Sequence, residues 1–332
     1  MSSRVQHYLW TTRWLKAEST LRVESGCRLR QYNENEADHL ARVVRNRNIN
    51  ARLRGRKDFY YQRAANLEDE TVIEIINSGD LSPSDELRHQ AELAEAAIMA
   101  SLMIKGDRDK FLRKVVGVEG GQFDLNVISS GSDTDVSSTS EAEQVPSGIF
   151  VGKKAGRRFE KNGFRSLSDT VTSRSKISER IERALSWILQ SRTDRSVKSA
   201  IVKTTTAMET LLVIGREPTR RALLERSAYL LSDDPKERVQ ISRAVKDFYS
   251  SRGRIVHGES VAEDKEMTRT VEFGDRMVVL IALVLAANAD QWSNADDVRR
   301  YCDAVRWGEM RSCERPWSVR YLNTALDRSP KI

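Results

Sequence analysis

The sequence predicts a mainly helical protein whose carboxyl-terminal half is a compact helical bundle. Glycine and proline are sparse, at 17 and 6 of 332 residues, so long irregular segments are not expected. Five segments between residues 175 and 288 carry apolar side chains at helical spacing. The connections between them are short, which favours antiparallel neighbours packed as a bundle. The amino-terminal region is predicted to be mostly helical too, with a few short strands.

The five predicted helices have recognisable ends. Gly215 is a typical helix stop, Pro218 opens the next helix, and Asp233, Asp234 and Pro235 open the one after it. The longest apolar run, residues 277–287, is too short to cross a bilayer and is interpreted as a buried helix, so no membrane partner is expected. The predicted helices span residues 175–191, 196–214, 218–231, 233–257 and 264–288.

Composition divides the chain into five parts. A start signal at Ser82–Glu86 predicts a helix that runs to Gly106, and residues 123–129 are interpreted as a short strand. Residues 129–147 are acidic, rich in serine and poor in large apolar groups, which predicts a mobile linker or long loop. The predicted parts are an amino-terminal region of unknown role (1–128), this linker (129–147), a basic connecting segment (148–172), the helical domain (173–310) and a tail (311–332).

Basic residues are crowded into one amino-terminal stretch that also contains Phe59, Tyr60 and Tyr61. Aromatic rings can stack on bases while arginines neutralise phosphates, so this stretch is a candidate RNA contact. The alternative interpretation is a solvated, arginine-rich helix with one apolar stripe. The basic residues are Arg42, Arg45, Arg47, Arg52, Arg54, Arg56, Lys57 and Arg63.

Charge and cysteine content limit the classes of function. The net charge of +7 fits a polyanionic partner, with nucleic acid as the first candidate. Three scattered cysteines indicate a reducing compartment, and the first ten residues lack the apolar core of a signal peptide, so the cytoplasm is the expected location. The four histidines lie far apart and no paired-cysteine spacing is present, so we expect neither a metal site nor a cofactor.

One short segment carries groups suited to cutting RNA without a metal. Arg252 and His257 are separated by four residues near the end of the fourth predicted helix. Histidine can move the proton of a 2′-hydroxyl or protonate the leaving oxygen, while arginine neutralises charge gathering on the phosphate. On an ideal helix five residues rotate about 500°, which leaves the two side chains roughly 140° apart. A cleft between two protomers removes this problem, because each side chain meets the equivalent one of its partner.

Four segments in the correct order resemble the ApeA-like HEPN family. The resemblance covers roughly residues 173 to 290 and rests on Trp187-Ile188, Ala207-Met208-Glu209-Thr210-Leu211-Leu212, Arg226-Ser227-Ala228-Tyr229-Leu230-Leu231 and Tyr249-Ser250-Ser251-Arg252-Gly253-Arg254-Ile255-Val256-His257-Gly258. It implies a HEPN-like helical bundle that forms a homodimer with a shared, metal-independent endoribonuclease site. It also implies a setting in antiphage defence or a toxin–antitoxin pair. One departure is Gly253, where HEPN nucleases often carry a polar residue.

The expected roles follow from this resemblance and from the chemistry of each side chain. His257 is the general base or acid, and Arg252 stabilises the phosphorane-like transition state. Arg254 and Lys246 hold flanking phosphates of the RNA, and Glu209 either orients Arg252 or makes only a local helix pair. If Gly258 caps the helix, His257 lies at its negative end, where a protonated imidazole is favoured.

Two other functions remain open at the level of the sequence. In the first, the bundle dimerises and binds RNA or a protein without cutting, an interpretation that Gly253 favours. In the second, the chain is an antitoxin-like or regulatory scaffold whose basic segment matches acidic surfaces. A protein regulator that keeps the chain silent is a possible further partner.

Overall fold

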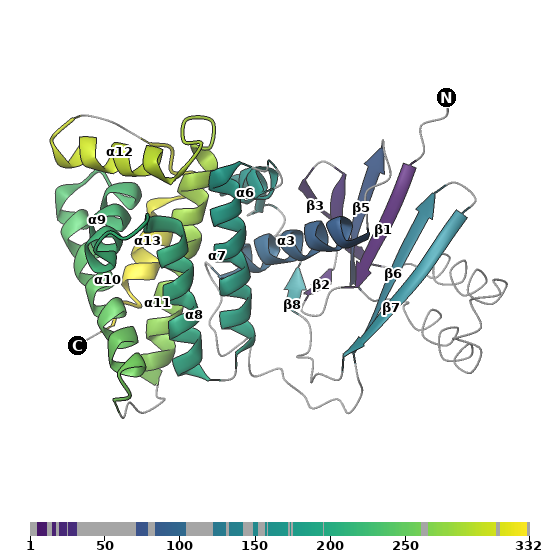
Figure 1. Ribbon diagram of the computed structural model, residues 1–332, viewed down its shortest axis with the longest axis horizontal. Coiled ribbons are helices and arrows are strands. Elements are labelled where there is room, and N and C mark those ends of the chain that lie inside the picture. The colour runs from purple at the N-terminus through teal and green to yellow at the C-terminus, as the bar shows by residue number, and fades with distance from the viewer. Residues whose placement is uncertain are drawn as a thin grey trace. The chain divides into compact units, whose positions relative to one another are not determined.

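The computed structural model describes most of the chain as two compact units (Figure 1). One unit consists of residues 1–95 and 113–156, and the other of residues 96–112 and 157–332. The structure describes residues 5–11, 15–17, 20–24, 26–31, 71–78, 84–103, 122–130, 133–141, 149–151, 157, 159–171, 173, 175–194, 196–259, 265–309 and 313–330. The arginine-rich stretch between residues 42 and 63, a predicted RNA contact, lies outside the described residues.

The amino-terminal unit contains an antiparallel six-stranded sheet in the order β3-β4-β5-β1-β6-β7. A separate pair is parallel and joins β2 to β8. The strands are β1 (Val5–Thr11), β2 (Leu15–Ala17), β3 (Leu21–Glu24), β4 (Cys27–Gln31), β5 (Thr71–Ser78), β6 (Gln122–Ser130), β7 (Asp133–Glu141) and β8 (Ile149–Val151).

Strand β5 lies in the interior of this sheet and buries a charge along with its apolar side chains. Val72, Ile73 and Ile75 are buried, and so is Glu74 between them. The Glu74 carboxylate accepts a hydrogen bond from Arg30 of β4, with Nε and Oε2 2.9 Å apart, and also pairs with Arg28. Burial alone would raise the pKa of Glu74, but the two arginines outweigh it and lower this pKa to about 2. The carboxylate is therefore held in its charged form inside the sheet.

The amino-terminal region carries more strand than the sequence predicted. The mainly helical class is confirmed for the chain. The helix predicted to start at Ser82–Glu86 and run to Gly106 is present as α3 (Ser84–Met103). The interpretation of residues 129–147 as a linker or loop is corrected for residues 133–141, which form β7 and pair along their length with β6. Backbone hydrogen bonds at a sheet edge do not require apolar side chains, and Thr and Val suit a strand.

The carboxyl-terminal unit is a bundle in which α7 packs on α8, α9 on α10, and α11 on α6, α7 and α8 (Figure 1). Its helices are α6 (Phe164–Val171), α7 (Lys176–Thr193), α8 (Val197–Leu212), α9 (Thr219–Leu231), α10 (Pro235–Val256), α11 (Lys265–Ala287), α12 (Ala295–Arg306) and α13 (Val319–Leu326). All residues of α11 from Thr270 to Ala286 are buried, so this helix is the core of the bundle.

The five predicted bundle helices are confirmed, and their starts have clear local causes. The side chains of Ser175, Ser196 and Asp234 each accept a hydrogen bond from a backbone N–H in the first turn of α7, α8 and α10. Pro235 then occupies the first turn of α10, where its missing N–H costs nothing. Gly215 has a φ of 60° in the turn after α8, a conformation that glycine adopts without strain.

The helical unit extends beyond the predicted limits of 173 and 310 at both ends. The basic connecting segment predicted at 148–172 includes α6, whose Phe164 and Leu167 are buried and which packs on α11. The predicted tail, residues 311–332, includes α13, whose Tyr321 and Leu322 are buried and which also packs on α11. Each helix is only eight residues long, and such short amphipathic stretches give a weak periodic signal.

The end of α8 is closed by arginines from two neighbouring helices. Arg180 of α7 donates to the carbonyl oxygens of Thr210 (2.7 Å) and Val213 (3.0 Å), and Arg226 of α9 donates to the carbonyl of Leu212. Carbonyl groups in the last turn of a helix have no N–H partner within the helix. The arginines supply that hydrogen bond, and their positive charge is favourable at the negative end of the helix dipole. The C-terminal turn of α8 is thereby fixed against α7 and α9.

Within the described ranges of the chain, no helix combines the length and apolar character needed to span a membrane.

Candidate active site

Helix α10 carries the predicted catalytic pair, and its register is fixed by packing on the core. Ile241, Val245 and Phe248 are buried along one face. The Phe248 ring meets the edge of Phe273 on α11, with centroids 5.9 Å apart. A Cβ added at Gly274 of α11 would come within 2.5 Å of the Phe248 ring, so this glycine allows the close approach of the two helices. The direction of each later side chain on α10 follows from this contact.

The helix ends at the histidine, as the sequence predicted. His257 is the C-cap of α10, and its backbone N–H donates to the carbonyl of Gly253 over 3.0 Å. Gly258 follows with a φ of 77° and donates to Ile255, while Glu259 donates to Arg254 over 3.0 Å. This pair of bonds is the Schellman motif, which favours glycine at the left-handed position. His257 therefore lies at the C-terminal, negative end of the helix dipole.

Arg252 lies one turn beyond Phe248 and continues the face of α10 that is turned towards the bundle. It is half-buried, and its guanidinium carbon lies 5.9 Å from the centre of the Tyr249 ring. Glu209 of α8 is also half-buried; burial raises its pKa, and the charge of Arg252 partly opposes that rise. Among the described residues no carboxylate forms an ion pair with Arg252. The structure thus brings Arg252, Tyr249 and Glu209 into one neighbourhood.

His257 lies on a different face of the same helix. Because α10 stays helical through Val256, the five residues from Arg252 to His257 turn the backbone by about 500° and advance it by about 7.5 Å. The two side chains therefore project about 140° apart, and His257 is exposed to solvent. A single chain does not bring the imidazole and the guanidinium together. Glycine does not unwind the segment either, because Gly253 is an ordinary helical residue.

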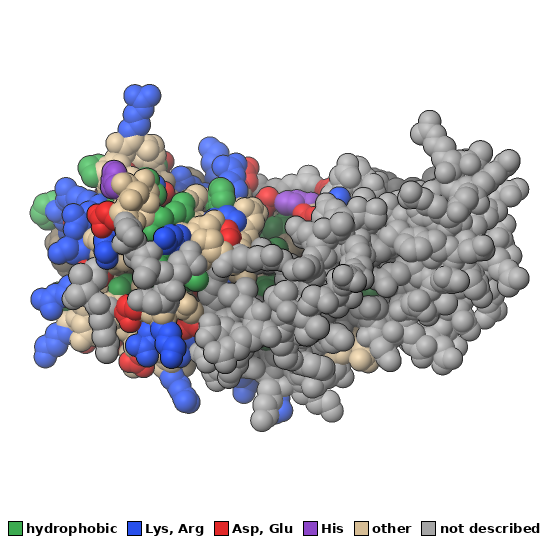
Figure 2. Space-filling view, turned by 90° about the horizontal axis from the view of Figure 1, so that it is seen from below, with side chains coloured by type: hydrophobic (Ala, Val, Ile, Leu, Met, Phe, Trp, Pro, Cys, Tyr) green, Lys and Arg blue, Asp and Glu red, His purple; other side chains and the backbone are tan. Residues whose placement is uncertain are grey.

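The two residues predicted to hold RNA phosphates share the outward face of α10 with His257. Lys246 precedes His257 by eleven residues, close to three full turns, and is exposed. Within the described part of the chain, Lys246 forms no ion pair. Arg254 is also exposed, and its Nε lies 2.8 Å from Oε2 of Glu259. Figure 2 shows other lysine and arginine side chains spread over one face of the carboxyl-terminal unit, with acidic side chains between them.

Gly253, the departure from the HEPN pattern, is not required by the fold. A Cβ built there meets no atom of the described residues within 4 Å, and Gly253 lies within regular helix. Any side chain would therefore project freely into solvent beside Arg252. The absence of a polar side chain here is a property of the sequence and not of the packing.

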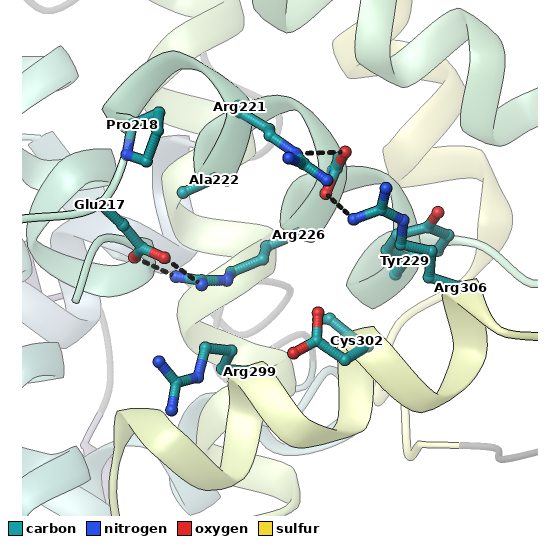
Figure 3. A pocket seen from close by; sticks show the side chains of 11 residues that line it. Glu217, Pro218, Arg221, Ala222, Arg226, Tyr229, Arg299, Cys302 and Arg306 are labelled. Carbon is teal, nitrogen blue, oxygen red and sulfur yellow. Dashed lines mark hydrogen bonds and ion pairs between the residues drawn. The ribbon is translucent and has the colours of Figure 1, made fainter.

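A cavity of about 180 Å³ lies elsewhere in the bundle, between α9 and α12 (Figure 3). Four arginines line it, and the sequence had singled out none of them for a functional role except Arg226 as part of the family resemblance. They are Arg221, Arg226, Arg299 and Arg306. The helix pattern could not reveal this cavity, because its walls come from segments about 80 residues apart. No predicted catalytic or phosphate-binding residue lines it.

The described residues contain no group of three or more histidine, cysteine or carboxylate side chains arranged to hold a metal ion. The chain matches no family model, no curated protein and no solved structure.

Proposed function

We propose that the carboxyl-terminal unit is a metal-independent endoribonuclease of HEPN type that acts as a homodimer in the cytoplasm. Its site consists of Arg252 and His257 from both protomers, and its substrate is RNA. One observation carries the proposal: both side chains reach the surface at the same end of α10, on faces about 140° apart. A second copy of this helix end, related by a two-fold axis, would bring Arg252 and His257 of both protomers to one shared site.

The chemistry of cleavage needs only what these side chains supply. His257 removes the proton of the 2′-hydroxyl, and the resulting oxygen attacks the adjacent phosphorus. A protonated imidazole then gives a proton to the departing 5′-oxygen, so a 2′,3′-cyclic phosphate and a 5′-hydroxyl are formed. Arg252 neutralises the charge that gathers on the phosphoryl oxygens. Lys246 and Arg254, which share the outward face with His257, hold neighbouring phosphates.

Glu209 is proposed as the residue that positions Arg252. Its half-buried carboxylate lies close enough to Arg252 for the two charges to interact. An attraction of this kind turns the guanidinium towards α8 and limits the rotamers that it samples. We further propose that such an activity serves antiphage defence or a toxin–antitoxin pair under the control of a protein regulator.

A non-catalytic module that binds RNA or protein as a dimer is the second candidate. It is favoured by the surroundings of His257, since no described side chain makes a hydrogen bond to the imidazole. Catalytic histidines are usually oriented by such a partner. Gly253 favours it too, because no polar group stands beside Arg252.

The test is cleavage of mixed RNA by the pure full-length protein in excess EDTA. Arg252→Ala and His257→Ala are compared with Arg243→Ala, which removes an exposed cation from the same helix without touching the proposed pair. Loss of cleavage in the first two variants, with activity kept in the third, supports the enzyme. RNA that is bound but stays intact with the wild-type protein supports the non-catalytic module.

A further inference from the structure

The cavity between α9 and α12 has features that nothing in the proposed ribonuclease site explains. Helix α12 packs on α9, and arginines of both helices line the cavity between them (Figure 3). Two of the exposed arginines meet at one carboxylate, Arg221 from α9 and Arg306 from α12. Their guanidinium groups come from residues 85 positions apart in the chain, so the fold has gathered them.

Arg226, one of the arginines that line the cavity, is already engaged in contacts within the bundle. Arg226 is 6% exposed and grips Glu217 with two hydrogen bonds of 2.6 and 2.5 Å, drawn as dashed lines in Figure 3. This pair is charge-neutral, and the same arginine also holds the end of α8. Arg226 is therefore part of the framework of the bundle and is not available to a ligand.

The Glu225 carboxylate, by contrast, is shared by two exposed arginines, Arg221 and Arg306. Oε1 of Glu225 lies 2.9 Å from Nε of Arg221, and its Oε2 lies 3.4 Å from Nη1 of Arg306. All three side chains are at least one-third exposed. Exposed ion pairs of this kind contribute little to stability. The Glu225 carboxylate thus lies where two cations from different helices can bind an anion, and its own ion pairs there are weak.

An aromatic ring stands beside one of these two cations, Arg306, at the edge of the cavity. Trp307, the C-cap of α12, is 78% exposed, and the guanidinium carbon of Arg306 lies 5.4 Å from the centre of its ring. An exposed indole offers a flat apolar face on which a nucleobase can stack. Arg306 connects the two features, because it touches both Glu225 and the indole.

We propose that this cavity binds a nucleoside 5′-phosphate. The phosphate replaces the Glu225 carboxylate between Arg221 and Arg306, where arginines make charge-assisted hydrogen bonds to its oxygens. The base stacks on Trp307, and the ribose spans the step between them. The ligand is either a free nucleotide or the 5′-phosphorylated end of a nucleic acid strand. This site shares no residue with Arg252 and His257 and does not depend on the proposed cleavage.

Binding is tested by calorimetry with the full-length protein and 5′-AMP, adenosine and inorganic phosphate as probes. Wild type is expected to bind 5′-AMP at least tenfold more tightly than adenosine. Arg221→Ala and Arg306→Ala should each weaken 5′-AMP at least tenfold, and Trp307→Ala should weaken 5′-AMP but not phosphate. Glu225→Gln should tighten 5′-AMP several-fold, because the competing charge is removed. This last variant distinguishes a ligand site from a purely structural ion pair.

Arg183→Ala is the matched control. Arg183 makes the same kind of exposed i,i+4 pair, with Glu179 on α7, away from the cavity. Equal binding of 5′-AMP by Arg183→Ala and Arg221→Ala would overturn the proposal, as would weaker binding by Glu225→Gln or no binding of 5′-AMP at millimolar concentration. The thermal unfolding midpoint of each variant shows that it is folded at the temperature of the titration.

Two further probes separate the sources of the phosphate. They are deoxyadenosine hexamers with and without a 5′-phosphate, which lack the 2′-hydroxyl that cleavage needs. Tighter binding of the phosphorylated hexamer than of 5′-AMP assigns the site to strand ends. Equal or weaker binding assigns it to free nucleotides. A hexamer that binds equally with and without its 5′-phosphate contradicts recognition of a terminal phosphate.

Discussion

Arg192 of α7 and Asp275 of α11 form an ion pair from which solvent is fully excluded. Nε and Oδ2 lie 2.8 Å apart, and both side chains are 0% exposed. Thr204 of α8 donates to the other carboxylate oxygen over 2.7 Å, and Ser191 lies within hydrogen-bond distance of Thr204. Three helices are therefore joined through one buried carboxylate in the centre of the bundle.

Removing one partner of this pair is expected to be costly. Asp275→Leu leaves the Arg192 cation without its counter-ion in the core, and we expect a loss of about 3–5 kcal/mol in the free energy of unfolding. The double variant Arg192→Met with Asp275→Leu should recover most of that loss, because no uncompensated charge remains. Urea unfolding followed by circular dichroism measures both. A double variant no more stable than the single one would contradict this account of the pair.

Two glycines in α10 and α11 should respond in opposite ways to the same substitution. Gly274→Ala forces a methyl group against Phe248 and Thr204, and should destabilise the bundle by about 1–3 kcal/mol. Gly253→Ala places its methyl group in open space within a helix and should stabilise by about 0.5–1 kcal/mol. Thermal unfolding of the two variants provides the comparison. A destabilised Gly253→Ala would mean that this position is not free of contacts.

The stability of the amino-terminal sheet should depend on pH through Glu74. The two arginines lower the folded-state pKa of Glu74 to about 2 from an ordinary value of 4.5. The resulting stabilisation, about 3 kcal/mol, is fully present above pH 4.5 and is lost as the pH falls towards 2. Glu74→Gln should remove it, so the difference from wild type should shrink between pH 5 and pH 3.

Hydrogen exchange of β4 and β5 peptides in dilute urea, corrected for the intrinsic rates at each pH, measures this effect locally. Glu92→Gln is the control, since Glu92 makes an exposed pair with Arg88 in α3. The control should show no comparable change with pH. An equal response of the two variants would refute the role of Glu74.

The proposed shared site can be tested by mixing two inactive variants. Arg252→Ala and His257→Ala are each expected to lose at least about 100-fold in cleavage rate. A mixed dimer of the two retains one intact Arg252 and one intact His257 on different protomers. The mixture should therefore cleave RNA about tenfold faster than either variant alone, after incubation that lets subunits exchange. Cleavage by the mixture equal to the mean of the two variants would exclude complementation across the dimer.

The bundle helices could be predicted because their signals are local. Ser175, Ser196 and Asp234 cap the helices that follow, and their apolar stripes are long enough to show the helical period. Strand β7 could not be predicted, because an edge strand is held by backbone pairing with β6 and its side chains carry no apolar pattern. Helices α6 and α13 are short, and their packing on α11 makes them part of the bundle.

The candidate site could be predicted in part. The position of His257 at the helix end followed from Gly258. Glu209 lies close enough to Arg252 for the two charges to interact, and its role in orienting Arg252 stays a prediction. The buried Arg192–Asp275 ion pair could not be predicted from the sequence, because the two residues are 83 positions apart and meet only in the folded chain. The same holds for the cavity, where Glu225 and Arg306 lie 81 positions apart.

The Schellman closure at Gly258 has a consequence for how the proposed ribonuclease should respond to heating. Among the described residues, His257 is held by the last turn of α10. Around that turn Val256, Gly258 and Glu259 are exposed, while Phe248 and α11 are anchored in the core. Local opening of such a turn costs far less free energy than melting the bundle. The imidazole would swing away while the helices stay folded, so heat inactivation should begin well below the temperature at which the bundle unfolds.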